Sequence, residues 1–183
     1  HTKERFLKEC LRVRYSDKRE KSFSISLVKQ MVHLIRDPFD NIVSRFRHLF
    51  RANHFTEAEK VIYTNSAAGF RTFCRDKVDL FDTSFWRESF DSFPDISLWR
   101  KMESVPCYTD FLRYINWHNL AFEVIRDAGL PHMIIHYEQY GTNWNETVTG
   151  LVHFLDQKVT RPNEFLFTAG KTYRRYYTSD EVD

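Results

Sequence analysis

Residues 31–44 read MVHLIRDPFDNIVS, an apolar run followed by an amphipathic one. The five residues from Met31 to Ile35 have the length and composition of a buried strand. Asp37 and Pro38 then favour the start of a helix, because aspartate caps free amides and proline suits the first helical position. Apolar residues recur at intervals of three and four after Pro38, which predicts an amphipathic helix to about residue 52.

The rest of the chain repeats this alternation of strands and helices. Residues 57–75 have a helical pattern, and residues 109–128 form the clearest helix, which Gly129 and Pro131 end. A second buried strand follows over residues 132–137, and Asn143 or Asn145 then caps another helix. This order predicts an α/β fold with a mainly parallel sheet, in a single domain over residues 1–183.

Two stretches fit this pattern less well. Residues 1–24 are polar, and we expect their charge run, residues 17–21, to form a solvated loop or a helix end. Residues 79–106 are mixed and rich in aromatic side chains, which suggests an excursion that faces a substrate. Aromatic residues make up 16% of the chain, so we expect a thick core, with an aromatic-walled acceptor cleft as a further use of these rings.

The charge balance does not favour a general binder of polyanions such as nucleic acids. Lys and Arg total 27 against 25 Asp and Glu, a net charge of +2, so an anion site must be local and built from particular residues. The sequence contains no apolar run of about 18 residues, the length of a membrane anchor. The N-terminus does not read as a signal peptide and lacks an initiating Met, so we expect these residues to be the C-terminal portion of a longer protein.

The three cysteines are too few for a disulfide scaffold and do not have the spacing of a zinc site. Cys74 and Cys107 flank the irregular stretch, and a bridge between them would close a loop of the size that a disulfide stabilises. Cys10 would then pair with a cysteine upstream; three buried thiols are the alternative. Asn145 begins a glycosylation sequon, Asn-Glu-Thr. Together these features favour the oxidising secretory pathway.

Arg36 and Ser44 are the candidate ligand-binding residues of the opening stretch. Arg36 follows a strand, and the carboxyl ends of parallel strands are where α/β proteins bind ligands. Its planar guanidinium suits phosphate oxygens, the helix that starts at Pro38 directs free amides to the same place, and Ser44 adds a hydroxyl two turns along. These features predict an anion site. The alternative is a surface ion pair between Arg36 and Asp37 or Asp40.

Arg36, with Ser44 eight residues later and an apolar strand before it, resembles a sulfotransferase motif. That motif holds the 3′-phosphate of 3′-phosphoadenosine 5′-phosphosulfate (PAPS). Residues 32–46 look most like the Golgi-type and algal or plant carbohydrate sulfotransferases, and a second block agrees in its order: Tyr114, residues 117–121 and residues 136–138. The resemblance implies the P-loop-NTPase-like sulfotransferase fold, a site without a metal, and Tyr137 beside the adenosine.

Residues 170–178 are similar to the closing loop of that family, whose basic groups and backbone amides cover the 3′-phosphate. The similarity implies that Lys171 and Arg174 contact the nucleotide, although many members have Lys at the position of Arg174. A basic exposed tail is the alternative. Residues 170–172 read GKT but are not a P-loop, because Phe165 stands in place of its first glycine and no apolar strand precedes them.

The resemblance implies transfer of a sulfuryl group from PAPS to a hydroxyl or amine of an acceptor, favoured to be a glycan, in the Golgi lumen or secretory pathway. It places the phosphosulfate-binding loop and a catalytic His or Glu upstream of residue 1. Within the chain, no residue takes the role of the base; His48 and His118 are weak candidates beside a packing or surface role.

Two other functions stay open at this point. If the upstream loop has been lost, the chain is a catalytically inactive sulfotransferase-like subunit or scaffold in a larger assembly. The second is a kinase-like or other nucleotide-binding enzyme. The sequence gives that reading little support, because it contains no Walker loop and no pattern of magnesium-binding carboxylates.

Overall fold

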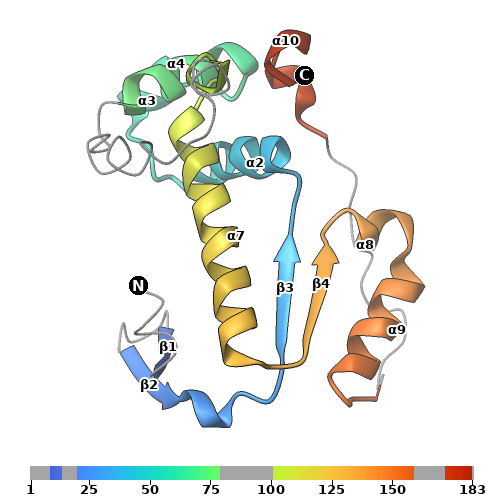
Figure 1. Cartoon of the computed structure of the whole chain (residues 1–183). Coiled ribbons are helices and arrows are strands. Elements are labelled where there is room, and N and C mark those ends of the chain that lie inside the picture. Colours follow the sequence, from blue (N-terminus) through green and yellow to red (C-terminus); the bar gives the residue numbers. More distant parts are fainter. Residues whose placement is uncertain (1–8, 14–19, 79–100, 159–171, 183) are drawn as a thin grey trace. The chain divides into compact units, whose positions relative to one another are not determined.

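The computed structural model describes residues 9–13, 20–78, 101–158 and 172–182 (Figure 1). Over these ranges the protein is a mixed α/β structure, mostly helical, with a small parallel sheet. The chain divides into two compact units. The first unit comprises residues 1–36 and 115–170, and the second comprises residues 37–114 and 171–183.

The first unit contains the parallel sheet. Strand β3 (Met31–Ile35) pairs in parallel with β4 (His132–His136), in a register that sets Met31 opposite His132 and Ile35 opposite His136. Both strands and their parallel pairing were predicted and are confirmed, but the expectation that they are buried was wrong, because Val32, Leu34 and Ile134 are exposed. The amide of Tyr137 donates to the carbonyl oxygen of Ile35 at 2.7 Å, which extends the pairing one residue beyond β4.

An antiparallel hairpin precedes this sheet in the chain. Its strands are β1 (Glu9–Val13) and β2 (Glu20–Ser24), and a short 3-10 helix, η1 (Ile25–Leu27), follows. The expectation of a loop or helix end was therefore wrong for Glu20 and Lys21, which lie in β2. Backbone pairing with β1 overrides the low strand preference of charged residues. Residues 17–19 of the charge run lie outside the described residues.

Helices complete the first unit. Helix α7 (Tyr108–Ala128) contributes its residues from Ile115 onward and ends at Gly129, which has a positive φ of 60° that glycine adopts without strain. Helices α8 (Gln139–Thr142) and α9 (Trp144–Phe154) follow β4. Asn143 precedes α9 as expected, but its side chain makes no capping hydrogen bond.

The second unit is helical. It contains α2 (Pro38–Arg51), α3 (Glu57–Ile62), α4 (Ala67–Val78), the first turns of α7, a 3-10 helix η2 (Arg174–Tyr176) and α10 (Ser179–Val182). Asp37 caps α2 by accepting from the amide of Asp40 at 3.1 Å, and Pro38 opens the helix, both as predicted.

The helix expected over residues 57–75 is two helices. Thr56 and Glu59 form a capping box at the start of α3. Ser66 precedes α4 and caps its N-terminus, since its hydroxyl accepts from the amide of Gly69 at 3.1 Å. Short polar side chains of this kind compete with the helix for backbone groups and therefore favour a break. Most of the expected excursion, residues 79–100, lies outside the described residues.

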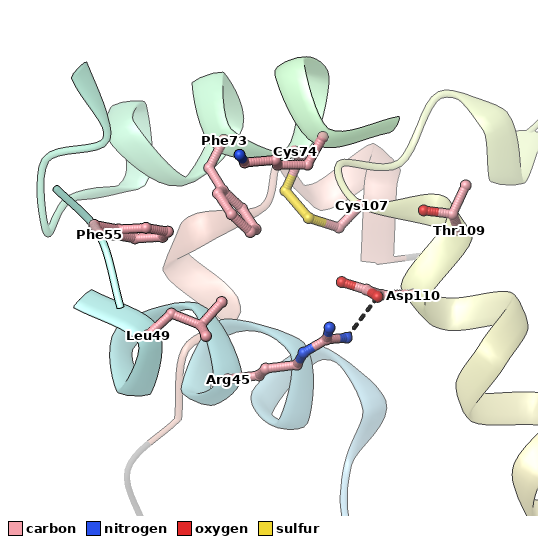
Figure 2. A pocket seen from close by; sticks show the side chains of 9 residues that line it. Arg45, Leu49, Phe55, Phe73, Cys74, Cys107, Thr109 and Asp110 are labelled. Atoms are coloured by element: carbon pink, nitrogen blue, oxygen red, sulfur yellow. Dashed lines mark hydrogen bonds and ion pairs between the residues drawn. A yellow bond between two sulfur atoms is a disulfide. The ribbon is translucent and has the colours of Figure 1, made fainter. Parts of the chain in front are cut away.

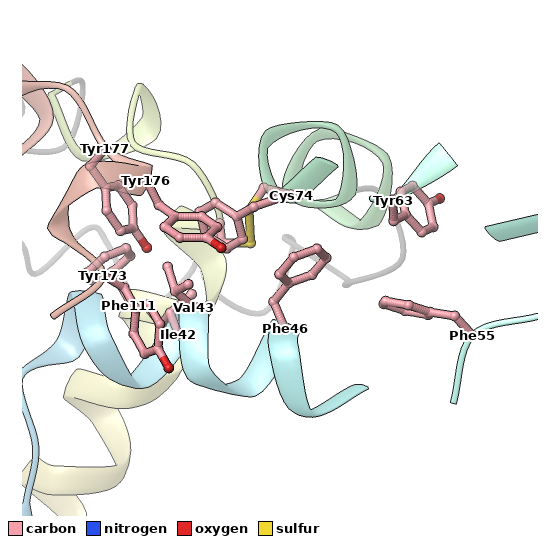
Figure 3. Packing of buried hydrophobic residues seen from close by; sticks show 12 residues of the cluster. Ile42, Val43, Phe46, Phe55, Tyr63, Cys74, Phe111, Tyr173, Tyr176 and Tyr177 are labelled. Atoms are coloured by element: carbon pink, nitrogen blue, oxygen red, sulfur yellow. A yellow bond between two sulfur atoms is a disulfide. The ribbon is translucent and has the colours of Figure 1, made fainter. Parts of the chain in front are cut away.

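Aromatic rings form the core of the second unit, as their abundance predicted (Figure 3). One face of α2 supplies Ile42, Val43 and Phe46, and α4 supplies Phe70, which has no exposed surface. Burying a side chain of this size contributes about 1.5–3 kcal/mol. The remaining members of the cluster come from the segments around them: Phe55, Tyr63, Cys74, Cys107, Phe111, Tyr173, Tyr176 and Tyr177.

Three further contacts hold this unit together. Cys74 and Cys107 form a disulfide, which confirms the pairing suggested from their positions; Cys10 lies in β1. Arg71 makes two hydrogen bonds to Glu181, at 2.7 and 2.8 Å, which link α4 to α10. Gly69 allows a close approach of backbones, because a Cβ there would overlap the backbone of Thr64.

Candidate functional site

Arg36 and Tyr137 occupy equivalent places in the first unit, directly after β3 and β4. Because the two strands are parallel and in register, their carboxyl ends lie at the same edge of the sheet. The guanidinium carbon of Arg36 lies 4.6 Å from the centroid of the Tyr137 ring, a cation–π contact. Both side chains are partly buried. The structure thus brings together two of the five residues predicted to bind the nucleotide.

The N-terminus of α2, where a phosphate was predicted to bind, lies in the second unit together with Arg174 of the predicted closing loop. The backbone amide of Tyr173 donates to Asp40 at 2.6 Å, and the guanidinium of Arg174 lies 3.4 Å from Asp37. The loop that begins at Thr172 is therefore anchored on the start of this helix. It places Arg174, which is largely exposed, beside the helix end that was predicted to receive a phosphate.

The cap of α2 corrects the expectation of free helix amides at this end. Pro38 has no amide hydrogen, and the amide of Asp40 donates to Asp37, so among the first three helical residues only Phe39 has an amide that these bonds do not use. Asp37 and Asp40 also place two carboxylates at the positive end of the helix dipole. An anion bound there must be held by side chains rather than by a row of backbone amides.

Ser44 and Lys171 complete the predicted set. Ser44 is partly buried on α2 in the second unit, whereas Arg36 belongs to the first unit, so their joint action on one phosphate stays a prediction. Lys171 lies outside the described residues. An ion pair of Arg36 with Asp37 or Asp40 stays the alternative; Asp37 also contacts Arg174, and Asp40 also accepts from the amide of Tyr173.

A cavity of about 190 Å³ opens in the second unit between α2, α4 and the start of α7 (Figure 2). Its walls are mainly apolar, and Arg45 and Asp110 form an ion pair of 2.7 Å at one side. Lys77 adds a second cation. This volume lies below the range of about 300–1,000 Å³ that is typical of ligand pockets. The other lining residues are Leu49, Phe55, Phe73, Cys74, Cys107 and Thr109.

A buried pair of histidines lies in the first unit, and only one of the two was singled out from the sequence. Nε2 of His33, on β3, lies 2.6 Å from Nδ1 of His118, on α7. Trp117 and Phe122 surround the His33 ring, and both histidines are almost fully buried. His33 is the single polar residue of the apolar strand β3, which is a signal of a special role, whereas His118 lies between Asn116 and Asn119 and has no such signal.

The environment of this pair favours its neutral form. Burial lowers the pKa of both histidines, and the neighbouring His33 lowers the pKa of His118 further. One hydrogen bond between two imidazoles needs one N–H and one lone pair, so the two rings are not both charged while the bond lasts. His118 therefore has the packing role that was set against a catalytic one. His48 is exposed on α2.

Comparison with protein-family models, characterised proteins and solved structures finds no significant match to this chain. Among the described residues, no three or more His, Cys, Asp or Glu side chains gather where they could hold a metal ion. The helices within the described ranges are all too short or too polar to cross a membrane.

Proposed function

We propose that this chain is the nucleotide-holding part of a PAPS-dependent sulfotransferase. The observation that carries the proposal is the contact between Arg36 and Tyr137 at the carboxyl edge of the parallel strands. A guanidinium that lies over an aromatic ring is held in a fixed orientation by that ring, and its planar shape suits phosphate oxygens. A nucleotide with a phosphate on its ribose needs such a cation close to an aromatic surface.

The five predicted residues have complementary roles in this proposal. Arg36 binds the 3′-phosphate through its guanidinium, and Ser44 donates its hydroxyl to the same phosphate. Tyr137 lies beside the adenosine. Lys171 and Arg174 belong to the closing loop and neutralise the phosphate from its solvent side. The anchoring of that loop on α2, through Tyr173 and Asp40, supports this arrangement because it holds Arg174 near the start of the helix that carries Ser44.

The finer fold that goes with this function is the P-loop-NTPase-like sulfotransferase fold. PAPS supplies the activated sulfuryl group, and the acceptor is a hydroxyl or amine, favoured to be that of a glycan in the Golgi lumen. The residues of this chain bind and orient the nucleotide. Removal of the acceptor proton is left to a group beyond them, since the buried His118 is bonded to His33 and is not placed for that task.

The test is a calorimetric titration with adenosine 3′,5′-bisphosphate, the product that keeps the 3′-phosphate. The Arg36→Ala variant should lose about 2–3 kcal/mol of binding free energy, roughly a 30- to 150-fold weaker affinity, because one charge-assisted contact pair is removed. Ser44→Ala should cost about 1 kcal/mol.

Adenosine 5′-monophosphate, which lacks the 3′-phosphate, is the matched control ligand. Arg36→Ala should leave its weaker affinity nearly unchanged, since the deleted contact is absent in that complex. Arg75→Ala, which removes an exposed arginine of α4, should bind the bisphosphate as the wild type does. Equal affinity of folded Arg36→Ala and wild type for the bisphosphate would contradict the proposal. Tight binding without sulfuryl transfer by the protein with its natural termini would instead identify the inactive subunit.

A further inference from the structure

The sequon at residues 145–147 has no part in the nucleotide site. Asn145-Glu146-Thr147 is the single Asn-X-Ser/Thr triplet in the sequence. It lies in the first turn of α9, which begins at Trp144. A sequon also arises by chance, so the surroundings of its asparagine and its threonine decide whether it can carry a glycan.

Asn145 lies on the outer side of α9. The buried side of this helix includes Thr147, and Gly150 faces the side chain of Met133 on β4. With 3.6 residues per turn, Asn145 is about 160° around the helix from Thr147. Its side chain is exposed, and so is Thr149, one turn further along α9, while Val148 beside it is partly buried. A bulky, hydrated group at Asn145 displaces none of the contacts of α9 with Gln139 and Met133 described above.

Thr147 has the opposite environment. It is 7% exposed, and its hydroxyl lies 3.4 Å from the carbonyl oxygen of Gln139, as the donor of a hydrogen bond. Enzymes that glycosylate a sequon engage the threonine hydroxyl as well as the asparagine. Because that hydroxyl is buried and bonded to Gln139 of α8 once the helices form, the sequon is accessible only before this part of the chain folds. The modification therefore has to occur on the nascent chain.

The disulfide of the second unit is an independent sign of the same compartment. Disulfides persist in the oxidising secretory pathway and are rare in the cytosol. Cys74 and Cys107 are both buried among aromatic residues, so their bond is a structural one. The compartment in which this bond forms is also the one in which nascent chains receive N-linked glycans.

We propose that Asn145 is the N-glycosylation site of this protein, modified before α9 folds. The donor is an oligosaccharide linked to a polyprenyl diphosphate. The side-chain amide nitrogen of Asn145 forms a bond to the anomeric carbon and loses one proton, and the bond from that carbon to the diphosphate breaks, releasing the lipid diphosphate. The glycan then extends from the outer side of α9, and Thr147 turns inward as the helix forms.

The experiment expresses the protein with its natural termini in a eukaryotic cell and compares total lysates before and after digestion with peptide N-glycosidase F. The wild type should shift to higher mobility on digestion, and the peptide that contains residue 145 should then carry aspartate there. Asn145→Gln should abolish the shift. Asn143→Gln, which changes the neighbouring asparagine outside the sequon, should keep it.

Two variants of Thr147 separate the glycan from the packing role of this residue. Thr147→Ser keeps a hydroxyl and should keep the glycan, whereas Thr147→Ala should lose it. Since modification precedes folding, a variant that fails to fold still reports whether its glycan was added. The proposal is overturned if Asn145 of the wild type is unmodified, whether the protein has entered the secretory pathway or stays in the cytosol, or if the shift survives in Asn145→Gln.

Discussion

The two units differ in how they bury their apolar surface. All twelve residues of the main buried cluster belong to the second unit, where rings from α2, α4 and the segment that follows Thr172 meet. Among the described residues, the first unit leaves more large apolar side chains exposed than the second: Leu27 is 68% and Trp117 is 60% accessible, and Val32, Leu34 and Ile134 of the paired strands are also exposed. In the second unit the exposed ones are Val61 and Ile62 of α3. Within the described residues, the second unit has the more complete core.

This difference indicates what each unit depends on. The second unit combines aromatic packing with a disulfide and an ion pair between α4 and α10. The first unit relies on two paired strands, a sheet that is marginal without further support, and on a buried contact between two histidines that can titrate. Arg36 and Tyr137 lie in this less consolidated unit, so a ligand that binds them should stabilise it measurably.

Removal of the disulfide should have the largest effect, and that effect should be confined to the second unit. The bond joins residues that are 33 apart in the sequence, and a crosslink of this span contributes about 3–4 kcal/mol by restricting the unfolded chain. Replacing both cysteines, Cys74→Ala with Cys107→Ala, should lower the free energy of unfolding by that amount. Hydrogen exchange resolved by peptide should show lost protection in α2 and α4.

The control is the wild type held under reducing conditions, which should behave as the double variant does. Protection of β3 and β4 should change little in either case. Equal loss of protection in both units would remove the contrast, because it would mean that the two units unfold as one.

Gly69→Ala should have the next largest effect. A Cβ at this position overlaps the backbone of Thr64, which cannot move aside without disturbing the break between α3 and α4. We expect a loss of about 2–3 kcal/mol, although alanine is the better helix former. Thermal unfolding followed by circular dichroism measures the change.

Gly150→Ala is the matched substitution in the first unit. Gly150 also lies in a helix, but a Cβ there would meet only the flexible end of Met133, at 3.4 Å. The free energy of unfolding of Gly150→Ala should be unchanged or higher by up to about 1 kcal/mol. Similar losses of stability for the two alanine variants would mean that the overlap with Thr64 does not cause the loss in Gly69→Ala.

The sequence predicted the elements that have local signals. Asp37 and Pro38 mark the start of α2, Gly129 marks the end of α7, and the two apolar runs became the paired strands β3 and β4. The hairpin of β1 and β2 was missed because residues 1–24 were judged by their overall polarity, although Leu11 and Val13 flank Arg12 with the alternation of a strand. The break between α3 and α4 was missed because residues 57–75 were read as one helical pattern. The polar residues 64–66, which separate the two helices, were not recognised as a break.

The candidate site, like the fold, was predictable where a local signal exists and not where residues far apart in the sequence meet. Arg36 and Tyr137 each follow a predicted strand, so their proximity in a parallel sheet follows from the pattern. The bond from the amide of Tyr173 to Asp40 joins residues 133 apart, and no local signal indicates it. Long-range pairs of this kind depend on the whole packing of the unit.

The smallest expected effect belongs to the histidine pair, and it concerns the first unit. Burial lowers the pKa of His33 and His118 in the folded state, so the unfolded state takes up protons first as the pH falls below about 6.5. The contribution of the pair to stability is complete above that pH and is lost as the pH falls through the lower pKa values of the folded state. Protection of β3 and β4 should therefore decrease between about pH 7.5 and about pH 5.5, after correction for intrinsic exchange.

His118→Phe should make this dependence on pH shallower. It should also cost about 1–2 kcal/mol near neutral pH, because Nε2 of His33 then has no partner in the pair. His48→Gln, which changes an exposed histidine of the second unit, should leave the pH profile as it is. If acid instead exposed α2 and α4 before the paired strands, the buried histidines would not be the titrating contact, and the first unit would not be the less stable of the two.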